Sequence, residues 1–298
     1  MTERNAEYDR FGPWVIEISD EDPPPPLFLP YLTRTDPTLL SVKIPRKIER
    51  RRANPGMDLY DYMVCLYEAD MMILQRVGHE VSSEAFSYRD VRQVRVSEHL
   101  LRGNVHLGLP GRSYDVPFST VSQQTMLRLV DLIRERYAGG NGNGPPGTTP
   151  PVAGGGLSFY FERLIAMEEA SGSAMRLVAA QAETAVGSRD TNAARRLFFG
   201  IAGKRLQESM HLTDGRELKV IDRGQPYAYR WQATYGTDTS YMPTANISAT
   251  AWQEDSRDTA VISLSLRTSG GAASWPFIRD NPSIDPYAAF LSALPGIE

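Results

Sequence analysis

Length, composition and charge set the first limits on this chain. It has 298 residues, of which 41% are hydrophobic and 23% are charged. Such a length favours two domains, each large enough to bury a core, and the composition is typical of globular rather than disordered proteins. Because the formal net charge is -4, overall basicity does not direct the chain to nucleic acid, and we expect no nucleic-acid partner.

The cysteine content and the N-terminal residues bear on the cellular compartment. Cys65 is the only cysteine, so neither an intrachain disulfide nor a cysteine-cluster metal site is expected. It lies in the apolar run Met63–Leu66, which predicts a small buried residue rather than a nucleophile. Residues 1–5 lead into acidic sequence without an apolar segment, and no run approaches the length of a membrane span. We therefore expect a cytoplasmic protein.

Residues 1–56 are predicted to be an irregular extension with a possible first strand at Trp14–Ile18. Four prolines, Pro23–Pro26, follow an acidic stretch and indicate an extended spacer. An SH3-type ligand is the alternative interpretation of this run. Leu39–Ile44 then has the pattern of a strand, and it leads into a basic segment.

Residues 57–138 predict the first folded domain. Short strand-like runs alternate with turn signals up to Phe118, as in all-β proteins. The period then changes from two to about 3.6 residues, which indicates an amphipathic helix that begins near Ser119 or Ser122. Its apolar face is expected to contain Met126, Leu129, Val130, Ile133 and Tyr137.

The second half begins with two segments of different character. Residues 139–156 are rich in Gly, Pro, Asn and Thr, so we expect a mobile linker there. Residues 157–208 are rich in Ala, Leu, Met, Glu and Arg and are predicted to be helical, with interruptions at Ser171-Gly172 and Val186–Ser188.

Residues 209–298 predict the second β-rich domain. Thr213–Arg216 contains Asp-Gly, a strong hairpin signal. Further strands are expected at 228–235, 247–252, 260–266 and 273–277. A helix is expected after Asp285, which precedes a proline in the first turn.

The two β-rich regions end in a similar way. In the first, the strand Gly103–Leu109 is followed by a glycine turn, a strand ending in Pro117-Phe118, and a helix. In the second, the strand Ala260–Leu266 is followed by a Gly-Gly turn, a strand ending in Pro276-Phe277, and a helix. Identity outside the Pro-Phe dipeptide is low. A tandem duplication is the favoured interpretation, and convergence on a common ending is the alternative.

Short antiparallel strands closed by one C-terminal helix resemble the pleckstrin-homology superfold, in particular the bacterial PH-like domains. Tyr62–Tyr137 carries the resemblance, including the run Phe86–Val91, and Met210–Leu294 follows the pattern less closely. The resemblance implies an α+β fold of two mainly antiparallel β-barrel or sandwich units, each closed by a C-terminal helix, with the helical segment between them. It also implies binding of lipid head groups or protein segments.

One turn departs from the phosphoinositide-binding members of that superfold. Those members have basic residues on the first hairpin, whereas this chain has Glu68-Ala69-Asp70. Negative charge at that position repels phosphate, which argues against head-group binding there.

The most pronounced charge feature is a basic run with Glu49 as its only acidic residue. Each such charge near an anionic leaflet contributes roughly 1 kcal/mol, so the run is a candidate anion- or partner-binding site. The alternative is a solvated strand edge whose charges prevent edge-to-edge pairing. The candidate residues are Lys43, Arg46, Lys47, Arg50, Arg51 and Arg52.

The tryptophans of the second β region also have two interpretations. Trp231, Trp252 and Trp275 are expected mainly in the core. Together with Tyr227, Tyr229 and Tyr235 they would alternatively line a groove.

No familiar catalytic or cofactor motif is present. The four histidines have unrelated spacings, no Gly-x-Ser-x-Gly element occurs, and Gly154–Gly156 lacks the Lys-Ser/Thr of a phosphate loop. We therefore expect no metal, no cofactor and no enzymatic activity. The leading hypothesis is a non-catalytic binding or scaffolding protein with a protein partner. The alternatives are a peripheral membrane adaptor that uses the basic run, and an enzyme with a dispersed active site.

Overall fold

The computed structural model describes residues 3–137, 156–186, 203–229, 231–232, 234–255, 258 and 260–297. The fold is α+β, and every strand pairing with a defined register is antiparallel. The chain divides into two compact units. Unit 1 comprises Met1–Val91, Leu100–His106 and Tyr114–Tyr137, and unit 2 comprises Arg92–His99, Leu107–Ser113 and Ala138–Glu298. The predicted linker, apart from Gly156, lies outside the described residues.

Unit 1 contains an antiparallel sheet in the order β1-β2-β3-β4-β5. Its elements are α1 (Glu3–Arg10), β1 (Ile16–Glu17), η1 (Leu29–Tyr31), β2 (Leu40–Pro45), η2 (Arg50–Arg52), β3 (Tyr60–Leu66), β4 (Asp70–Val77), β5 (Glu80–Ser87), η3 (Tyr88–Asp90), η4 (Thr120–Ser122) and α2 (Gln123–Tyr137). Strands β7 (Arg102–Leu109) and β8 (Arg112–Ser119) are each divided between the two units.

One core of unit 1 lies between its sheet and the N-terminal residues. Side chains of β3 and β4 pack with Phe11 and Phe28, which are both buried. Cys65 is buried in this core as predicted, and burial raises the pKa of its thiol. The helix predicted after Ser119 is α2, and Met126, Leu129, Val130 and Ile133 form its buried face.

The N-terminal predictions need two corrections. The strand at 14–18 is present as β1, but Glu3–Arg10 forms the helix α1 instead of irregular chain. In addition, β2 pairs with β3 along its length, so the first sheet includes residues that precede the predicted domain start at 57. The 14 residues between β2 and β3, counted from Arg46 to Leu59, separate these partners in the sequence and hide their pairing.

Unit 2 is built around the sheet segment β6-β15-β13-β12-β9. Its elements are β6 (Gln93–His99), α3 (Phe159–Ala170), β9 (Arg176–Gln181), β10 (Thr184–Ala185), β11 (Lys204–Leu206), β12 (Ser209–Thr213), β13 (Glu217–Asp222), β14 (Tyr227–Tyr229), β15 (Gly236–Pro243), η5 (Thr244–Asn246), β16 (Ile247–Glu254), β17 (Val261–Thr268), β18 (Gly271–Ile278) and α5 (Ile284–Ser292). Strands β16-β17-β18 and β10-β11-β14 form two further antiparallel sheets.

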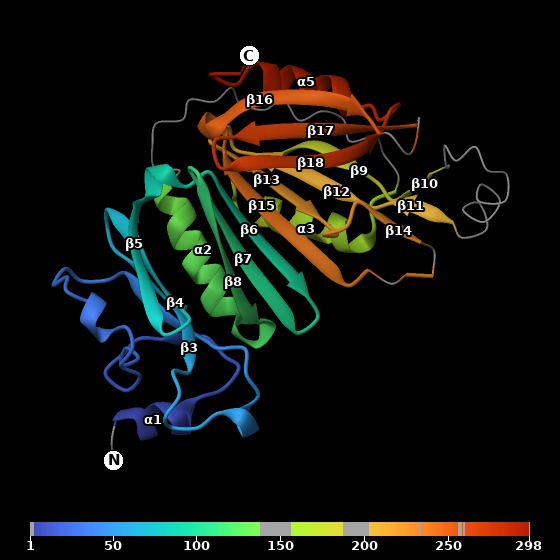
Figure 1. The fold of residues 1–298 in the computed structure, drawn as a ribbon. Helices are drawn as coiled ribbons and strands as arrows, with labels where there is room; N and C mark the ends of the chain where they lie inside the picture. Colours follow the sequence, from blue (N-terminus) through green and yellow to red (C-terminus); the bar gives the residue numbers. More distant parts are fainter. Residues whose placement is uncertain are drawn as a thin grey trace. The chain divides into compact units, whose positions relative to one another are not determined.

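Both faces of this sheet are covered (Figure 1). On one face, Phe161 of α3 packs against Met210 and Leu212 of β12. On the other face, residues of β17, β18 and α5 form a core with β13 and β15, in which Phe277 and Tyr287 are fully buried. Successive side chains along β12 and β13 point to opposite faces of the sheet, so these strands contribute residues to two separate cores.

The block predicted to be helical at 157–208 is only partly so. Phe159–Ala170 forms α3, but Arg176–Gln181 is strand β9 and Lys204–Leu206 is strand β11; residues 187–202 lie outside the described part. The sequence of β9, Arg-Leu-Val-Ala-Ala-Gln, has good helix formers. Its pairing with β12 outweighs that local preference.

The remaining β predictions differ in detail. The Asp-Gly hairpin is confirmed as β12-β13, with Gly215 at φ 87°. Residues 228–235 are not one strand, because β14 ends at Tyr229 and a separate strand, β15, begins at Gly236. The sheets of the described residues are open rather than closed barrels. In the sheet that contains β15, for example, β9 is an edge strand that pairs only with β12 among the described strands.

Candidate functional site

The predicted basic run divides into a buried residue and a surface group. Lys43 lies on β2 with 3% exposure, and its ammonium group donates to the Pro23 carbonyl at 2.9 Å. It also lies 3.8 Å from Asp22 and above the Tyr60 ring. Burial lowers the pKa of Lys43, and the Asp22 carboxylate opposes that shift. The Lys43 amine therefore binds groups inside unit 1. It does not belong to the same surface as the other five basic residues.

The other basic residues follow at the end of β2 and in η2. Arg50 donates to the carbonyls of Tyr8 and Phe11, so it fastens η2 to the N-terminal residues. Arg51 and Arg52 have 78% and 76% of their side chains exposed and share one carboxylate, Glu49. Arg46 is half-buried and Lys47 is exposed. The surface group keeps a net positive charge, because Glu49 is the only acidic residue among the basic residues of this run.

The acidic turn that departs from the PH pattern is compensated by arginines. Arg34 donates to Asp70 at 2.6 Å and is paired with Asp36. Arg136 of α2 lies 3.4 Å from Glu68. The two carboxylates of this turn thus hold neighbouring segments of unit 1 in place.

Unit 2 presents an exposed aromatic segment, which we define as residues 227–235 apart from Arg230 and Ala233. Trp231 and Tyr235 are 66% and 65% exposed. The rings of Trp231 and Tyr229 are stacked, with centroids 5.1 Å apart and planes inclined by 6°. By contrast, Trp275 is buried and Trp252 packs against the same core, as predicted. The prediction of a core position is therefore wrong for Trp231, whose ring is exposed.

The first part of this segment is anchored by β14. Tyr227 and Tyr229 pair with Leu206 and Lys204 of β11. The Tyr227 hydroxyl donates to Asp255 at 2.6 Å, and the ammonium group of Lys204 lies 3.9 Å from the Tyr227 ring centroid. These contacts fix the strand from which the stacked pair projects.

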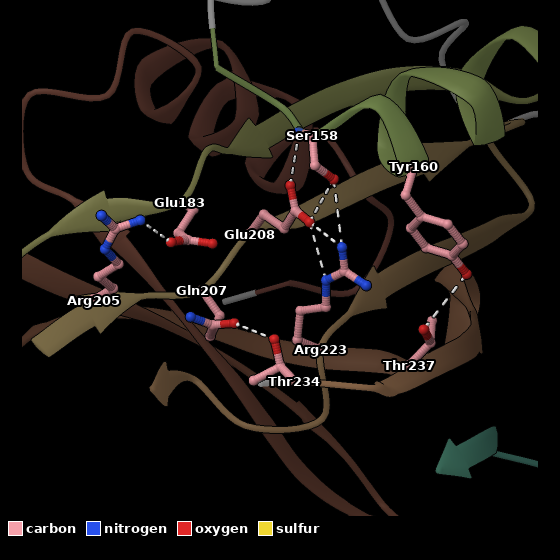
Figure 2. A network of polar contacts seen from close by, with 9 residues as sticks. All are labelled: Ser158, Tyr160, Glu183, Arg205, Gln207, Glu208, Arg223, Thr234 and Thr237. Carbon is pink, nitrogen blue, oxygen red and sulfur yellow. Dashed lines mark hydrogen bonds and ion pairs between the residues drawn. The ribbon is translucent and has the colours of Figure 1, made fainter. Parts of the chain in front are cut away.

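The second part is anchored by the polar network of Figure 2. The Thr234 hydroxyl donates to the Gln207 side-chain oxygen at 3.1 Å. The hydroxyls of Thr237 and Tyr160 lie 3.5 Å apart, which connects the start of β15 to α3. The aromatic segment therefore has a support near each end, at Tyr227 and at Thr234.

The centre of the network is an almost fully buried carboxylate, Glu208. It accepts hydrogen bonds from the Ser158 amide at 2.9 Å, from the Ser158 hydroxyl at 2.7 Å, and from Arg223 Nε at 3.0 Å. Arg223 Nη2 donates to the same carboxylate, whose side chain is 3% exposed. The guanidinium also lies over the rings of Tyr160 and Phe161, 4.9 Å from each centroid.

This arrangement explains how α3 is held on the sheet. Ser158 is the N-cap of α3, and a negative charge is favourable next to the unpaired amides of a helix N-terminus. Glu208 lies between β11 and β12, and Arg223 directly follows β13. The ion pair thus connects the start of the helix to three neighbouring strands. Its hydrogen bonds therefore give the ion pair a role in positioning α3.

A second buried polar contact lies in the core of unit 2. His211 of β12 is fully buried among Trp275, Phe277 and Tyr287, and its Nδ1 lies 2.9 Å from the Tyr287 hydroxyl. Burial lowers the pKa of His211 to about 3. The ring is therefore neutral at physiological pH, and it serves packing and one hydrogen bond.

Only part of this site could be anticipated from the amino-acid sequence. The aromatic cluster was recognisable as an alternative to core packing, but Glu208, Arg223 and Ser158 lie 15 to 65 residues apart and carry no spacing signal. Among the residues that the structure describes, no three potential metal ligands come together. None of the described helices is long and apolar enough to cross a membrane. No known family model matches the chain, and no curated protein sequence matches it.

Proposed function

We propose that this chain is a non-catalytic binding protein that recognises a protein partner through the aromatic segment of unit 2. The observation that carries the proposal is the stacking of Trp231 on Tyr229 while two thirds of the Trp231 side chain remains exposed. Trp and Tyr are the residues most enriched at energetic hot spots of protein interfaces. Stacking on Tyr229 restrains the Trp231 ring, which reduces the side-chain entropy that binding would cost.

The surroundings of the rings support a protein partner. A hot spot needs a polar rim, and Arg205 of β11, the strand beside β14, forms an ion pair with Glu183, which directly precedes β10. Gln232 lies between Trp231 and Tyr235 in the sequence, and its side-chain amide donates to the Gln225 side-chain oxygen at 3.2 Å. The rings together with these polar groups have the composition of an interface centre and its margin.

The test is a comparison of protein captured from the source organism by the wild-type chain and by a Trp231→Ala/Tyr235→Ala variant. We expect at least one protein to be retained by the wild type and lost with the variant. Its affinity for the double variant should fall by roughly thirtyfold or more, the effect of losing a hot-spot residue. Calorimetric titration of the purified pair measures that ratio.

The matched control is Phe159→Ala, because Phe159 is also an exposed aromatic residue of unit 2, with 77% exposure. This substitution should leave the captured set and the affinity unchanged. Equal capture by the wild type and the Trp231→Ala/Tyr235→Ala variant would refute the proposal.

We also propose that the chain contains two PH-like units in tandem. The support is the order of elements. A meander of β2-β3-β4-β5 is followed by η3, three further strands and α2. A meander of β9-β12-β13-β15 is followed by η5, β16-β17-β18 and α5, with β10, β11 and β14 as additions. An experimental structure in which residues 40–137 and 176–292 fail to superpose strand for strand would refute the duplication.

A further inference from the structure

Unit 1 has an exposed apolar surface of its own, separate in sequence from the aromatic segment. We call it the apolar tip and define it by Leu100, Leu101, Val121 and Trp14. Their exposed fractions are 63%, 72%, 66% and 49%. Four large apolar side chains left in water cost free energy unless something covers them.

The backbone of the tip is unusual for its residue type. Leu100 has φ 52°, and it is the only residue other than glycine with a positive φ in the described part of the chain. The left-handed region is unfavourable for leucine because its Cβ crowds the neighbouring carbonyl oxygen, and turns at such positions normally use Gly, Asn or Asp. The chain therefore keeps an apolar side chain at a position where a polar one would fit the backbone better.

The polar groups of the tip are already bonded to η4. The Thr120 hydroxyl donates to the Leu100 carbonyl at 2.8 Å, and the Thr120 amide donates to the Leu101 carbonyl at 3.3 Å. Because both carbonyls have donors, the turn can enter an apolar environment without leaving them unpaired.

Trp14 is joined to the same surface through η4. The Val15 amide donates to the Ser122 hydroxyl at 2.8 Å, in a buried contact next to Val121. The indole lies against Gly12, where an added Cβ would come within 2.4 Å of the ring. A partly exposed Trp beside aliphatic side chains is favourable at the interface between a bilayer and water.

The arginines of η2 lie near the Trp14 end of the tip. Trp14 and Arg50 line one shallow hollow of unit 1. Arg50 is the first residue of η2, where Arg51 and Arg52 are more than three-quarters exposed.

The hollow itself also contains acidic residues, so it is not the anion site. Asp22 is paired with Arg10 at 3.3 Å, and Glu17 is paired with Arg128 at 2.9 Å. Asp9 and Glu21 line the hollow as well. The net positive charge therefore belongs to η2 at its edge.

We propose that the apolar tip inserts into the surface of an anionic lipid bilayer while the arginines of η2 attract its head groups. Neither signal alone holds a protein firmly on a membrane, whereas an apolar insertion combined with a basic patch does. The cations beside the tip match an anionic leaflet in charge. This inference does not depend on the protein-binding function proposed for unit 2.

The test uses the full chain and vesicles of phosphatidylcholine with or without phosphatidylserine. We expect the wild type to sediment with the anionic vesicles at low salt and to be released as ionic strength rises. Replacing both arginines, Arg51→Gln/Arg52→Gln, should lower the partition coefficient about thirtyfold. The Leu100→Asn/Leu101→Asn variant should lower it by about tenfold or more.

The leucine variant also separates binding from folding. Asparagine tolerates the left-handed conformation, so the variant should melt at the same temperature as the wild type or higher. The matched control is Val77→Asn at the β4-β5 hairpin, where Val77 is 57% exposed; it should bind vesicles as the wild type does. The proposal is overturned if the wild type does not bind anionic vesicles, or if the folded leucine variant binds them as well as the wild type does. Loss of a captured protein with the leucine variant, without vesicle binding, would assign the tip to a protein partner instead.

Discussion

Replacing Glu208 by alanine should destabilise unit 2 by removing the acceptor at the centre of its polar network. The Glu208 side chain is 3% exposed, and it accepts bonds from both the N-cap of α3 and Arg223. In the variant, the Arg223 guanidinium would stay largely buried, with 16% exposure, and its charge would have no carboxylate. The loss therefore includes the cost of an unpaired buried cation as well as the missing hydrogen bonds.

Removing one partner of a buried ion pair costs about 3 to 5 kcal/mol. We expect the lower end, about 3 kcal/mol, because the partial exposure of Arg223 lets water reach its guanidinium. For a unit of this size, that loss corresponds to a melting temperature lower by about 6 to 12 °C. Glu208→Gln keeps the shape and part of the Ser158 bonding, and it should cost about 2 kcal/mol.

The assay is urea unfolding followed by circular dichroism, together with amide hydrogen exchange of α3 and residues 227–237. Exchange should accelerate first at the start of α3, where the capping carboxylate is lost. The matched control is Glu183→Ala, which removes the exposed ion pair with Arg205 and should cost less than about 1 kcal/mol. Equal destabilisation by the substitutions at 208 and 183 would refute the assignment of Glu208 as the buried anchor.

Two further predictions concern buried titratable groups. Burial lowers the pKa of His211 to about 3 from 6.5, so the unfolded chain binds a proton that the folded chain does not. The contribution of His211 to the free energy of unfolding is therefore fully present above pH 6.5. Below that pH the free energy of unfolding should fall by about 1.4 kcal/mol per pH unit. His211→Asn should flatten that decline relative to the wild type in pH-dependent urea unfolding, and an unchanged slope would contradict the reasoning. Burial also raises the pKa of the Cys65 thiol, so native protein should react with a thiol reagent far more slowly than urea-unfolded protein; rapid native labelling would contradict it.

The two proposed surfaces would together describe an adaptor. The aromatic segment of unit 2 would bind a protein, and the apolar tip of unit 1 would contact a lipid surface. The basic run contributes to this scheme through Arg51 and Arg52, which are exposed, and not through Lys43, whose amine is buried against Pro23 and Asp22. Separate substitutions at Trp231 and at Leu100 test the two activities independently.

Most of the local structure follows from residues that are close together along the chain. Apolar runs and turn signals located β12, β13 and β16 to β18, and the 3.6-residue period located α2. These predictions depend on neighbours along the chain, and for that reason they were largely correct. The Asp-Gly hairpin is the clearest case, because a tight turn fixes the register of the two strands that flank it.

Contacts between distant parts of the chain select which local preferences prevail. Arg176–Gln181 is a strand because β12 supplies its backbone partners, although its residues favour a helix. Lys43 and Arg51 look alike in the sequence, yet one faces the core region and the other faces solvent. Burial and ion pairing depend on groups brought together from distant positions, such as Ser158, Glu208 and Arg223. The candidate surfaces could therefore be identified only from the folded structure. It shows which polar and aromatic side chains bind other parts of the chain and which remain exposed.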